Sequence, residues 1–426
     1  MVLVVGAGPA GATAARTLAR AGVTVRLLDR SKFPRNKPCG GGISLRVLKR
    51  FPYLAAELSR IATHTVSRLH LEGPGGESTV IESDGPAALM IRRVEFDALL
   101  VDLAREAGAE LIGDVDIVRV STTASGVVLE SRDGRTFEAP VVIAADGVHS
   151  VIARRLGLNP GWPASSVALD MMEETSREQL RDIDPSTLWV SYGHPPSLAG
   201  DRQQASARQA HEGYAYVFPK RDHVNVGIGY VLDHYRNAID ESPYELQRGF
   251  VDHLRRRGVM EGESVRRNFT PFIIPVGGPL RQPGKGGVLL AGDAGGFVNG
   301  FTAEGIYYAM VSGDLAARTI ASTPAPAKLA RRYQRAVQRE IGAELRDSVL
   351  IQRYLFADRR RIANVINGAS QEPELTRLIL DFAVGRLSYS SLRWRVLARV
   401  PRLAAHLAWG RLKTKFLPGS ADVARV

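Results

Sequence analysis

The chain has 426 residues, a net charge of +12 and 45% apolar residues, a composition typical of a soluble globular protein with two or three domains. Its single cysteine, Cys39, excludes an intrachain disulfide and favours a reducing compartment. The residues before Gly6 leave no room for a signal peptide, and no apolar stretch approaches the roughly 20 residues of a membrane-spanning helix, so we expect a cytoplasmic protein.

The predicted elements begin with a strand, a glycine-rich turn, a helix and a second strand. Residues 2–5 are β-branched, an alanine-rich helical stretch follows, and residues 23–28 form the second strand. The turn reads Gly-Ala-Gly-Pro-Ala-Gly, which lets a pyrophosphate approach the backbone and the positive end of the helix. A carboxylate at the end of the second strand accepts hydrogen bonds from an adenosine ribose. The alternative is a tight turn without a ligand. The pattern predicts a dinucleotide site formed by Gly6, Gly8, Ala10, Gly11, Asp29 and Arg30.

The next feature is a glycine-rich loop at residues 37–44, Lys-Pro-Cys-Gly-Gly-Gly-Ile-Ser. Three consecutive glycines lose much backbone entropy on folding, and they make sense where something flat or bulky lies against the chain. The alternative is that Cys39 is a small buried residue of the core. We predict that Cys39, Gly40 and Gly41 lie against a bound ligand.

Two further segments of the first 150 residues contribute to the prediction. A hairpin is expected at 66–83 and a helix at 94–107, followed by strands at 116–131 and 137–144. The last strand would deliver Asp146 to the carboxyl end of the sheet, where ligands bind. An Asp-Gly pair by itself is more often a turn. We interpret His149, which has no partner in the sequence, as structural.

From about residue 160 to 265 the pattern changes to strands with polar inserts, including an exposed loop at 195–210. The run at 214–219, Tyr-Ala-Tyr-Val-Phe-Pro, alternates aromatic side chains on one face of a strand. These side chains are either ordinary sheet aromatics or an apolar wall around a substrate. We predict that the wall consists of Tyr214, Tyr216, Phe218 and Pro219.

A third glycine-rich motif follows a buried strand at 288–291. The strand delivers Asp293, whose carboxylate is suited to the ribityl hydroxyls of a flavin. The helix predicted at 303–322 would point its positive N-terminus at the isoalloxazine ring of that flavin and stabilise negative charge on it. Gly305 and Ile306 would lie against the ring.

The C-terminal region begins at the Pro-Ala-Pro sequence of 324–326 and is helical in pattern. Residues 321–426 hold 20 lysines and arginines but only 8 acidic residues, so the whole basic excess lies here. Such a segment suits an anionic partner, or it forms solvated helix faces. Tryptophans and leucines alternate with arginines between 393 and 411, which is typical of an interfacial helix that takes lipid from a membrane or of one that packs on the core.

The turn at 6–11, the segment at 144–150 and the motif at 290–296 together resemble the FAD-dependent family with the p-hydroxybenzoate hydroxylase-type fold, and this resemblance adds Arg93, rather than Arg92, as a cofactor contact. Within that family, the loop at 37–44, the aromatic strand and the sequence at 385–389 resemble the geranylgeranyl reductases. Two positions depart from that pattern. Tyr216 stands where tryptophan is usual, and Gly300 stands where proline is frequent.

The resemblance implies an α/β fold with a Rossmann-like FAD-binding domain at 1–160 and 266–325, an inserted antiparallel β-sheet substrate domain at 161–265 and a helical region at 326–426. It implies an FAD-dependent reductase that saturates isolated C=C bonds of a prenyl lipid or quinone side chain, with Cys39 as proton source or as part of the flavin face. The alternatives are an aromatic monooxygenase or halogenase on the same scaffold, and a flavin-stabilised lipid carrier without catalysis.

The expected partners follow from the same interpretation. No second Gly-x-Gly-x-x-Gly occurs in a βαβ context, so the electron donor, NADPH or reduced ferredoxin, would bind transiently. We expect a prenyl lipid substrate, peripheral contact with an anionic membrane, no nucleic acid and no metal.

Overall fold

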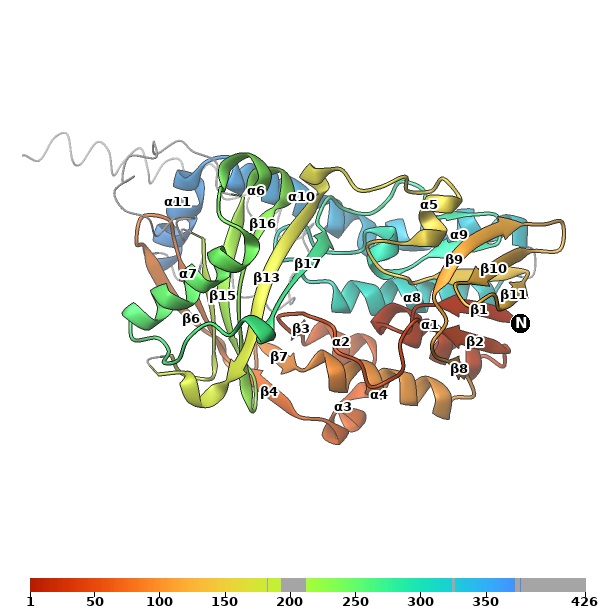
Figure 1. The fold of residues 1–426 in the computed structure, drawn as a ribbon, viewed down its shortest axis with the longest axis horizontal. Coiled ribbons are helices and arrows are strands. Elements are labelled where there is room, and N and C mark those ends of the chain that lie inside the picture. The colour runs from red at the N-terminus through yellow and green to blue at the C-terminus, as the bar shows by residue number, and fades with distance from the viewer. Residues whose placement is uncertain (182, 193–211, 324–325, 372–375, 377–426) are drawn as a thin grey trace, which may run out of the picture.

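The computed structural model describes residues 1–371 and 376, apart from 182, 193–211 and 324–325. Two lobes lie side by side along the long axis of the molecule, with the N-terminus at the far end of one of them (Figure 1). The predicted loop at 195–210, the sequence at 385–389 and the basic tail at 390–426 lie outside the described residues.

The first lobe is built on a six-stranded sheet that is parallel except for one edge pair. β-branched and leucine residues fill its strands because both faces are covered. Its order is β18 (Gly284–Lys285), β19 (Val288–Leu290), β12 (Val141–Ala144), β1 (Val2–Val5), β2 (Val25–Leu28) and β8 (Glu110–Ile112). One face packs on α1 (Pro9–Arg20), α4 (Arg93–Glu106) and α8 (Ile306–Ala321).

The other face of this sheet packs on a small antiparallel sheet of β9 (Ile117–Thr122), β10 (Val127–Ser131) and β11 (Thr136–Ala139), together with α5 (Val151–Arg155). The strand predicted at 137–144 is therefore two strands in different sheets. Pro140 separates β11 from β12, because a proline has no N–H for a sheet ladder.

The second lobe is a seven-stranded, mainly antiparallel sheet. Its order is β17 (Phe269–Pro275), β13 (Val167–Ser176), β16 (His223–Val231), β15 (Gly213–Pro219), β14 (Thr187–Ser191), β5 (Arg68–Glu72) and β6 (Ser78–Glu82), and only β14 and β5 run parallel. One face packs on α7 (Pro243–Arg256) around Trp189 and Phe250. The opposite face carries Tyr214 and Tyr216 toward the first lobe.

Smaller elements connect the lobes. A three-stranded sheet of β3 (Gly42–Ser44), β7 (Ala88–Ile91) and β4 (Thr63–Val66) lies between them, and the short helices α2 (Arg46–Arg50) and α3 (Leu54–Glu57) connect β3 to β4. Another short helix, α6 (Leu232–Ala238), follows β16. Short 3-10 turns complete the set: η1 (Leu58–Arg60), η2 (Ala164–Ser166), η3 (Arg177–Gln179), η4 (Arg266–Asn268) and η5 (Gly292–Gly295).

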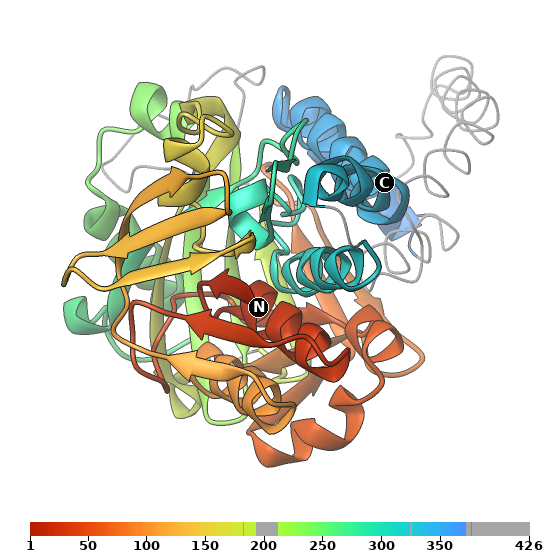
Figure 2. The ribbon, with the colours of Figure 1, turned by 90° about the vertical axis from the view of Figure 1, so that its right-hand side faces the viewer.

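The C-terminal helices pack on both lobes. They are α9 (Pro326–Val337), a π-helical turn η6 (Gln338–Gly342), α10 (Ala343–Phe356) and α11 (Arg359–Gln371). Figure 2 shows them along the side of the molecule where α8 lies. Phe356, Ile362 and Ile366 cover apolar residues of β5 and β6, while Tyr333 of α9 donates to the carbonyl of Leu290 in β19 at 2.7 Å.

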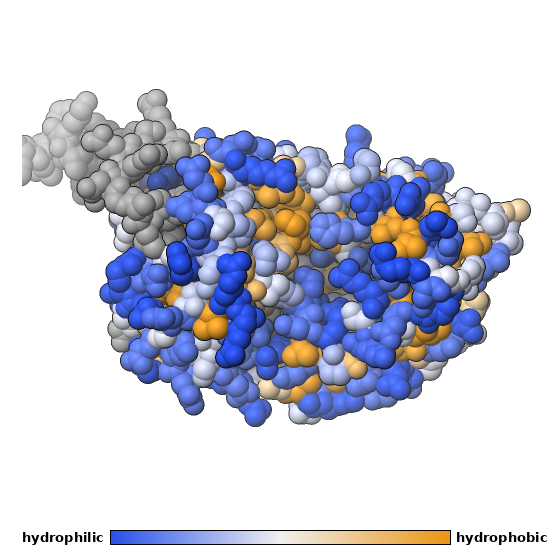
Figure 3. Space-filling view, viewed as in Figure 1, coloured by the Kyte–Doolittle hydropathy of each residue, from blue (hydrophilic) through white to orange (hydrophobic). Residues whose placement is uncertain are grey.

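This architecture confirms the predicted fold class, a Rossmann-like domain with an inserted, largely antiparallel sheet and C-terminal helices. The hairpin of β5 and β6, predicted at 66–83, joins the seven-stranded sheet, as does β17, although both lie outside residues 161–265. Within the described part of the chain, none of the helices is long and apolar enough to span a membrane. On the face shown in Figure 3, apolar side chains gather in small separate patches among hydrophilic ones.

Candidate active site

The turn between β1 and α1 is shaped by two glycines that tolerate no side chain. Gly6 has a φ of +94°, and a Cβ atom there would lie 2.2 Å from the carbonyl oxygen of Ala145. A Cβ atom on Gly11 would lie 1.8 Å from the carbonyl oxygen of Gly6. The chain therefore turns tightly, and the N-terminus of α1 opens onto a cleft with its backbone N–H groups exposed to a ligand.

Asp29 holds this turn in place from the end of β2. One carboxylate oxygen accepts a hydrogen bond from the backbone N–H of Ala7 at 2.6 Å, and the other accepts from that of Ser31 at 2.8 Å. Arg30 follows it on the wall of the cleft. The carboxylate thus has a structural task that the motif did not indicate, and its predicted contact with a ribose stays a prediction.

The cleft encloses about 320 Å³ between the two lobes. Eleven of the fourteen residues predicted to bind the cofactor line it: Gly6, Gly8, Ala10, Asp29, Arg30, Cys39, Arg93, Asp146, Asp293, Gly305 and Ile306. Gly11 lies beneath the turn, and Gly40 and Gly41 line an adjoining cavity. Chain segments that are almost 300 residues apart therefore meet around one space.

Asp146 lines this cleft, and its two carboxylate oxygens have different surroundings. Its Oδ2 accepts from the N–H groups of Val151 and Ile152 at 2.9 and 3.3 Å, which caps α5. Its Oδ1 is buried and has no hydrogen-bond partner in the described structure. Burial raises the pKa of this carboxyl group. A buried oxygen of this kind is suited to a ligand hydroxyl.

Arg93 lies on the cleft wall, whereas Arg92 turns away to pair with Glu174 at 3.1 Å. The Arg93 guanidinium makes two 2.7 Å bonds to the fully buried carboxylate of Asp97. Burial opposes the charged form of Arg93, but Asp97 and the neighbouring Cys39 together raise its pKa. A fixed positive charge therefore lies beside the glycine-rich loop.

A second cavity of about 180 Å³ adjoins the cleft. Tyr214, Tyr216 and Phe218 form one of its walls, with neighbouring ring centroids 6.3 and 4.6 Å apart. The Tyr214 hydroxyl donates to the carbonyl of Thr302 at 2.9 Å. Pro219, predicted with these aromatics, is buried at the end of β15 and does not line either space. The cleft and the cavity share a boundary formed by Cys39, Phe272, Ile274, Ala303, Gly305 and Ile306.

The glycine-rich loop lies at this boundary. Gly41 has a φ of +70°, and a Cβ atom there would lie 2.2 Å from the carbonyl oxygen of Ile91. The Cys39 sulfur is half-buried and accepts from the N–H of Gly41 at 3.3 Å. The thiol is thus held where both spaces meet.

Two buried polar residues that sequence reasoning missed hold the same loop. The Lys220 ammonium donates to the carbonyl of Gly40 at 2.7 Å and to the side-chain oxygen of Asn225. The Asn225 amide donates to the carbonyl of Cys39 at 3.1 Å. Burial lowers the pKa of Lys220 to about 7. A lysine after a strand is normally exposed, so the sequence carried no signal of this role beyond its position next to Pro219.

Two carboxyl groups in the second cavity were also missed: Asp170 is buried and Glu304 is half-buried. Asp170 of β13 accepts from the Tyr216 hydroxyl at 3.1 Å. Glu304, just before α8, accepts from the N–H of Ser44 at 3.2 Å. Burial raises the pKa of each to about 7. Glu304 belongs to the third glycine-rich motif, but nothing in its sequence context distinguished it from a solvated residue.

Comparison with known proteins agrees with this geometry. Residues 1–225 match the family model described as an FAD binding domain. The chain is 31% identical to digeranylgeranylglycerophospholipid reductase 2 of Methanothermobacter thermautotrophicus, over 83% of this chain and 87% of that protein. It is also 31% identical to the menaquinone reductase of Mycobacterium tuberculosis, over 78% of this chain and 80% of the relative. The chain belongs to the geranylgeranyl reductase family of FAD-dependent oxidoreductases.

The family's fold is also found among solved structures. A geranylgeranyl bacteriochlorophyll reductase-like protein from Thermoplasma acidophilum superposes with a TM-score of 0.72 at 21% identity, covering 89% of this chain and 98% of that one. The cleft fits the FAD that this family binds. The open N-terminus of α1, the unpartnered oxygen of Asp146 and the turn that would be blocked by a Cβ atom on Gly6 suit a dinucleotide with ribityl hydroxyls.

Proposed function

We propose that this protein of the geranylgeranyl reductase family is an FAD-dependent reductase that saturates isolated C=C bonds of a prenyl lipid or a quinone side chain. The observation that carries the proposal is the aromatic cavity directly adjoining the FAD cleft. An isolated alkene has no polar group to bind, so a site for it must work by shape and by excluding water. Aromatic and apolar side chains on one face of the seven-stranded sheet supply such a surface.

The relatives support the substrate class. One is named a digeranylgeranylglycerophospholipid reductase and another a menaquinone reductase, and both match this chain over more than three quarters of its length. FAD, when bound and reduced, supplies a hydride to the substrate. We propose that Gly6, Gly8, Ala10 and Gly11 form the pyrophosphate turn, and that Asp29, Arg30, Arg93, Asp146, Asp293, Gly305 and Ile306 hold the rest of the cofactor.

The glycine-rich loop would form the side of the site where substrate and cofactor meet. Gly40 and Gly41 let the backbone lie flat against the ligand, and Lys220 fixes the loop to the substrate sheet through the carbonyl of Gly40. Tyr214, Tyr216 and Phe218 would contact the prenyl chain, and Pro219 would end the strand behind them. The Cys39 thiol is either a proton source or a part of the cofactor face. An unchanged rate in Cys39→Ala would show that the thiol is not the proton source and is only a part of the cofactor face.

The electron donor and the cellular location belong to the same proposal. We propose that NADPH or reduced ferredoxin binds transiently, since the chain has one Gly-x-Gly-x-x-Gly in a βαβ context. We also propose a cytoplasmic protein that touches an anionic membrane through its basic C-terminal region. Sedimentation with anionic liposomes should be lost when 390–426 is deleted, and binding that survives the deletion would contradict this anchor.

Anaerobic turnover tests the central claim. Reduced protein mixed with geranylgeranyl diphosphate or menaquinone without oxygen should return to the oxidised flavin spectrum, and the product should gain two mass units for each saturated bond, as seen by mass spectrometry. An aromatic monooxygenase or halogenase would instead need oxygen. A lipid carrier without catalysis would show the same flavin reoxidation with and without prenyl lipid.

A further inference from the structure

Asp170 has an unusual position for a carboxyl group. It lies within β13, near one edge of the seven-stranded sheet, is only 7% exposed and lines the aromatic cavity. Its neighbours across the strands are Phe272 on one side and Gly229 on the other, so its side chain shares the cavity face with the aromatic wall. A buried carboxyl group in an apolar wall is costly to maintain and calls for a reason.

One oxygen of Asp170 is bound and the other is free. Oδ2 accepts from the Tyr216 hydroxyl at 3.1 Å, whereas Oδ1 is buried with no hydrogen-bond partner in the described structure. In the described part of this structure neither solvent nor the protein satisfies the free oxygen. A proton on Oδ1 would make the carboxyl group neutral and give it an O–H to donate into the cavity.

The contact between Tyr216 and Asp170 depends on the strand between them. Tyr216 lies on β15 and Asp170 on β13, with Gly227 of β16 in between. A Cβ atom on Gly227 would lie 2.4 Å from the Tyr216 hydroxyl oxygen. Only a glycine lets the ring lie flat across the middle strand and reach Asp170. The pair is therefore built by three adjacent strands.

The surroundings of Asp170 set its protonation. Burial raises its pKa to about 7, against the opposing effects of the Tyr216 hydrogen bond, the Lys37 charge and a backbone bond. The Lys37 ammonium lies 4.6 Å from the centre of the Phe272 ring beside Asp170. Tyr214 and the Cys39 thiol also line this cavity, and Glu304 lies on its opposite side before α8. Asp170 is thus protonated below about pH 7 and ionised above it.

We propose that Asp170 is the proton donor of the reduction and that Tyr216 is its positioning residue. This inference rests on the proposed function. When the alkene π bond breaks, two C–H bonds form: one takes the hydride that the reduced cofactor supplies, and the other takes the proton from Oδ1 of Asp170. The hydroxyl of Tyr216 stabilises the carboxylate that is left, and water that enters the cavity after the product leaves returns the proton before the next turnover. The electrons come from the nicotinamide or ferredoxin-type donor.

Single-turnover oxidation of the photoreduced holoenzyme by geranylgeranyl diphosphate or menaquinone tests the assignment. The rate in the unaltered protein should fall as pH rises through about 7, because the donor loses its proton. Asp170→Asn keeps the shape and the acceptor for Tyr216, and it should slow the reaction about 100-fold and abolish the pH dependence. FAD content and the unfolding temperature report whether the variant is folded.

Tyr216→Phe tests the positioning role through the pH at which the rate falls, which loss of a merely structural contact would not shift. Loss of its hydrogen bond destabilises the carboxylate, so the fall in rate should shift to higher pH. Tyr214→Phe is the matched control, since the Tyr214 hydroxyl bonds Thr302 instead of Asp170. In this variant the rate should fall at the same pH as in the unaltered protein. An infrared difference spectrum across about pH 5 to about pH 9 should show a protonated carboxyl band that is weaker in Asp170→Asn, because Glu304 accounts for the remainder.

The outcomes separate the two proposals. If the unaltered protein is reoxidised by a prenyl lipid but Asp170→Asn has the same rate and pH profile, the inference is wrong while the proposed function stands. A pH dependence abolished instead by Glu304→Gln or Cys39→Ala would assign the proton to that residue and overturn the role of Asp170. If no prenyl lipid reoxidises the unaltered protein, the proposed function fails, and the inference fails with it.

Discussion

The FAD cleft and the aromatic cavity share a boundary but are built in different ways. Backbone geometry shapes much of the cleft: a turn without room for a Cβ atom and the open N-terminus of α1. Side chains from separate strands of the second lobe shape much of the cavity, and its wall includes two carboxyl groups, those of Asp170 and Glu304, whose pKa values burial raises to about 7. Backbone recognition suits a cofactor that is always the same, whereas side chains can be exchanged to suit a particular substrate and reaction.

The largest effect is expected from a substitution that disrupts the FAD cleft and leaves the aromatic cavity intact. Gly11→Ala places a Cβ atom against the carbonyl oxygen of Gly6, which must move and distort the pyrophosphate turn. FAD affinity should fall by at least about 100-fold, equivalent to roughly 2.7 kcal/mol. Flavin content after purification and titration of the apoprotein with FAD measure this loss.

A matched control lies at the other end of the same helix. Gly22 follows α1 with a φ of +76° and nothing within 4 Å of a Cβ atom, and asparagine tolerates this conformation. Gly22→Asn should keep its FAD. Equal losses in the two variants would mean that helix stability, rather than the turn, controls the affinity.

A smaller effect is expected at the boundary between the two regions. Lys220→Met removes the bond to the carbonyl of Gly40 and leaves the side-chain oxygen of Asn225 without its donor, so the loop at 37–44 should loosen. Turnover should fall about 10-fold while FAD is retained, because the cleft itself is intact. Lys285→Met, at an exposed position, is the control.

Lys220→Met should also change how the free energy of unfolding depends on pH. The pKa of Lys220 is lowered in the folded protein to about 7, so between about pH 7 and about pH 10 the unfolded chain binds more protons. The free energy of unfolding of the unaltered protein should therefore rise with pH in this window relative to Lys220→Met. Parallel urea unfolding curves for the two proteins across that range would contradict the burial of this lysine.

The smallest expected effect lies within the cavity. Tyr214→Phe removes a single hydrogen bond to the carbonyl of Thr302, in the segment that leads into α8. A net loss of about 1 kcal/mol corresponds to roughly a 5-fold lower rate at constant FAD affinity. A fall in FAD affinity as large as the fall in rate would show that the aromatic wall also holds the cofactor.

The two regions also differ in how much the sequence predicts. The pyrophosphate turn, Asp146 and Asp293 are local patterns at strand ends, and the structure brings them to one cleft because parallel strands deliver their carboxyl ends to the same edge. The aromatic wall was predicted from its period of two along β15. Asp170 and Lys220 could not be found in this way, since their burial depends on strands far away in the chain.

Two of the predicted elements show what local sequence patterns do not predict. The hairpin at 66–83 was recognised as a hairpin, but its place beside β14 depends on contacts more than 100 residues away. The segment at 137–144 was predicted as one strand. In the structure it forms two strands on either side of Pro140, and these belong to different sheets. A periodic pattern reports which face of an element is apolar, and it contains no information about the partner that covers this face.

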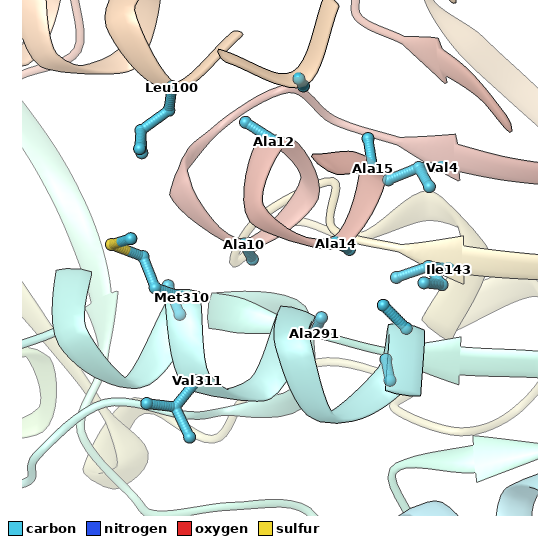
Figure 4. Close-up of a cluster of buried hydrophobic side chains, with 14 of the residues drawn as sticks. Val4, Ala10, Ala12, Ala14, Ala15, Leu100, Ile143, Ala291, Met310 and Val311 are labelled. Carbon is cyan, nitrogen blue, oxygen red and sulfur yellow. The ribbon is translucent and has the colours of Figure 1, made fainter. Parts of the chain in front are cut away.

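The packing of α1 on α8 has a consequence for how the chain is made. A Cβ atom on Gly313 would lie 2.1 Å from the carbonyl oxygen of Ala10, so the two helices touch backbone to backbone, and small side chains such as Ala10 and Ala14 fill the contact (Figure 4). During synthesis, α1 leaves the ribosome almost 300 residues before its partner. Its alanine face stays uncovered until α8 emerges, and the cleft lacks Asp293, Gly305 and Ile306 until then, so we expect cofactor binding to be a late event in the life of the nascent chain.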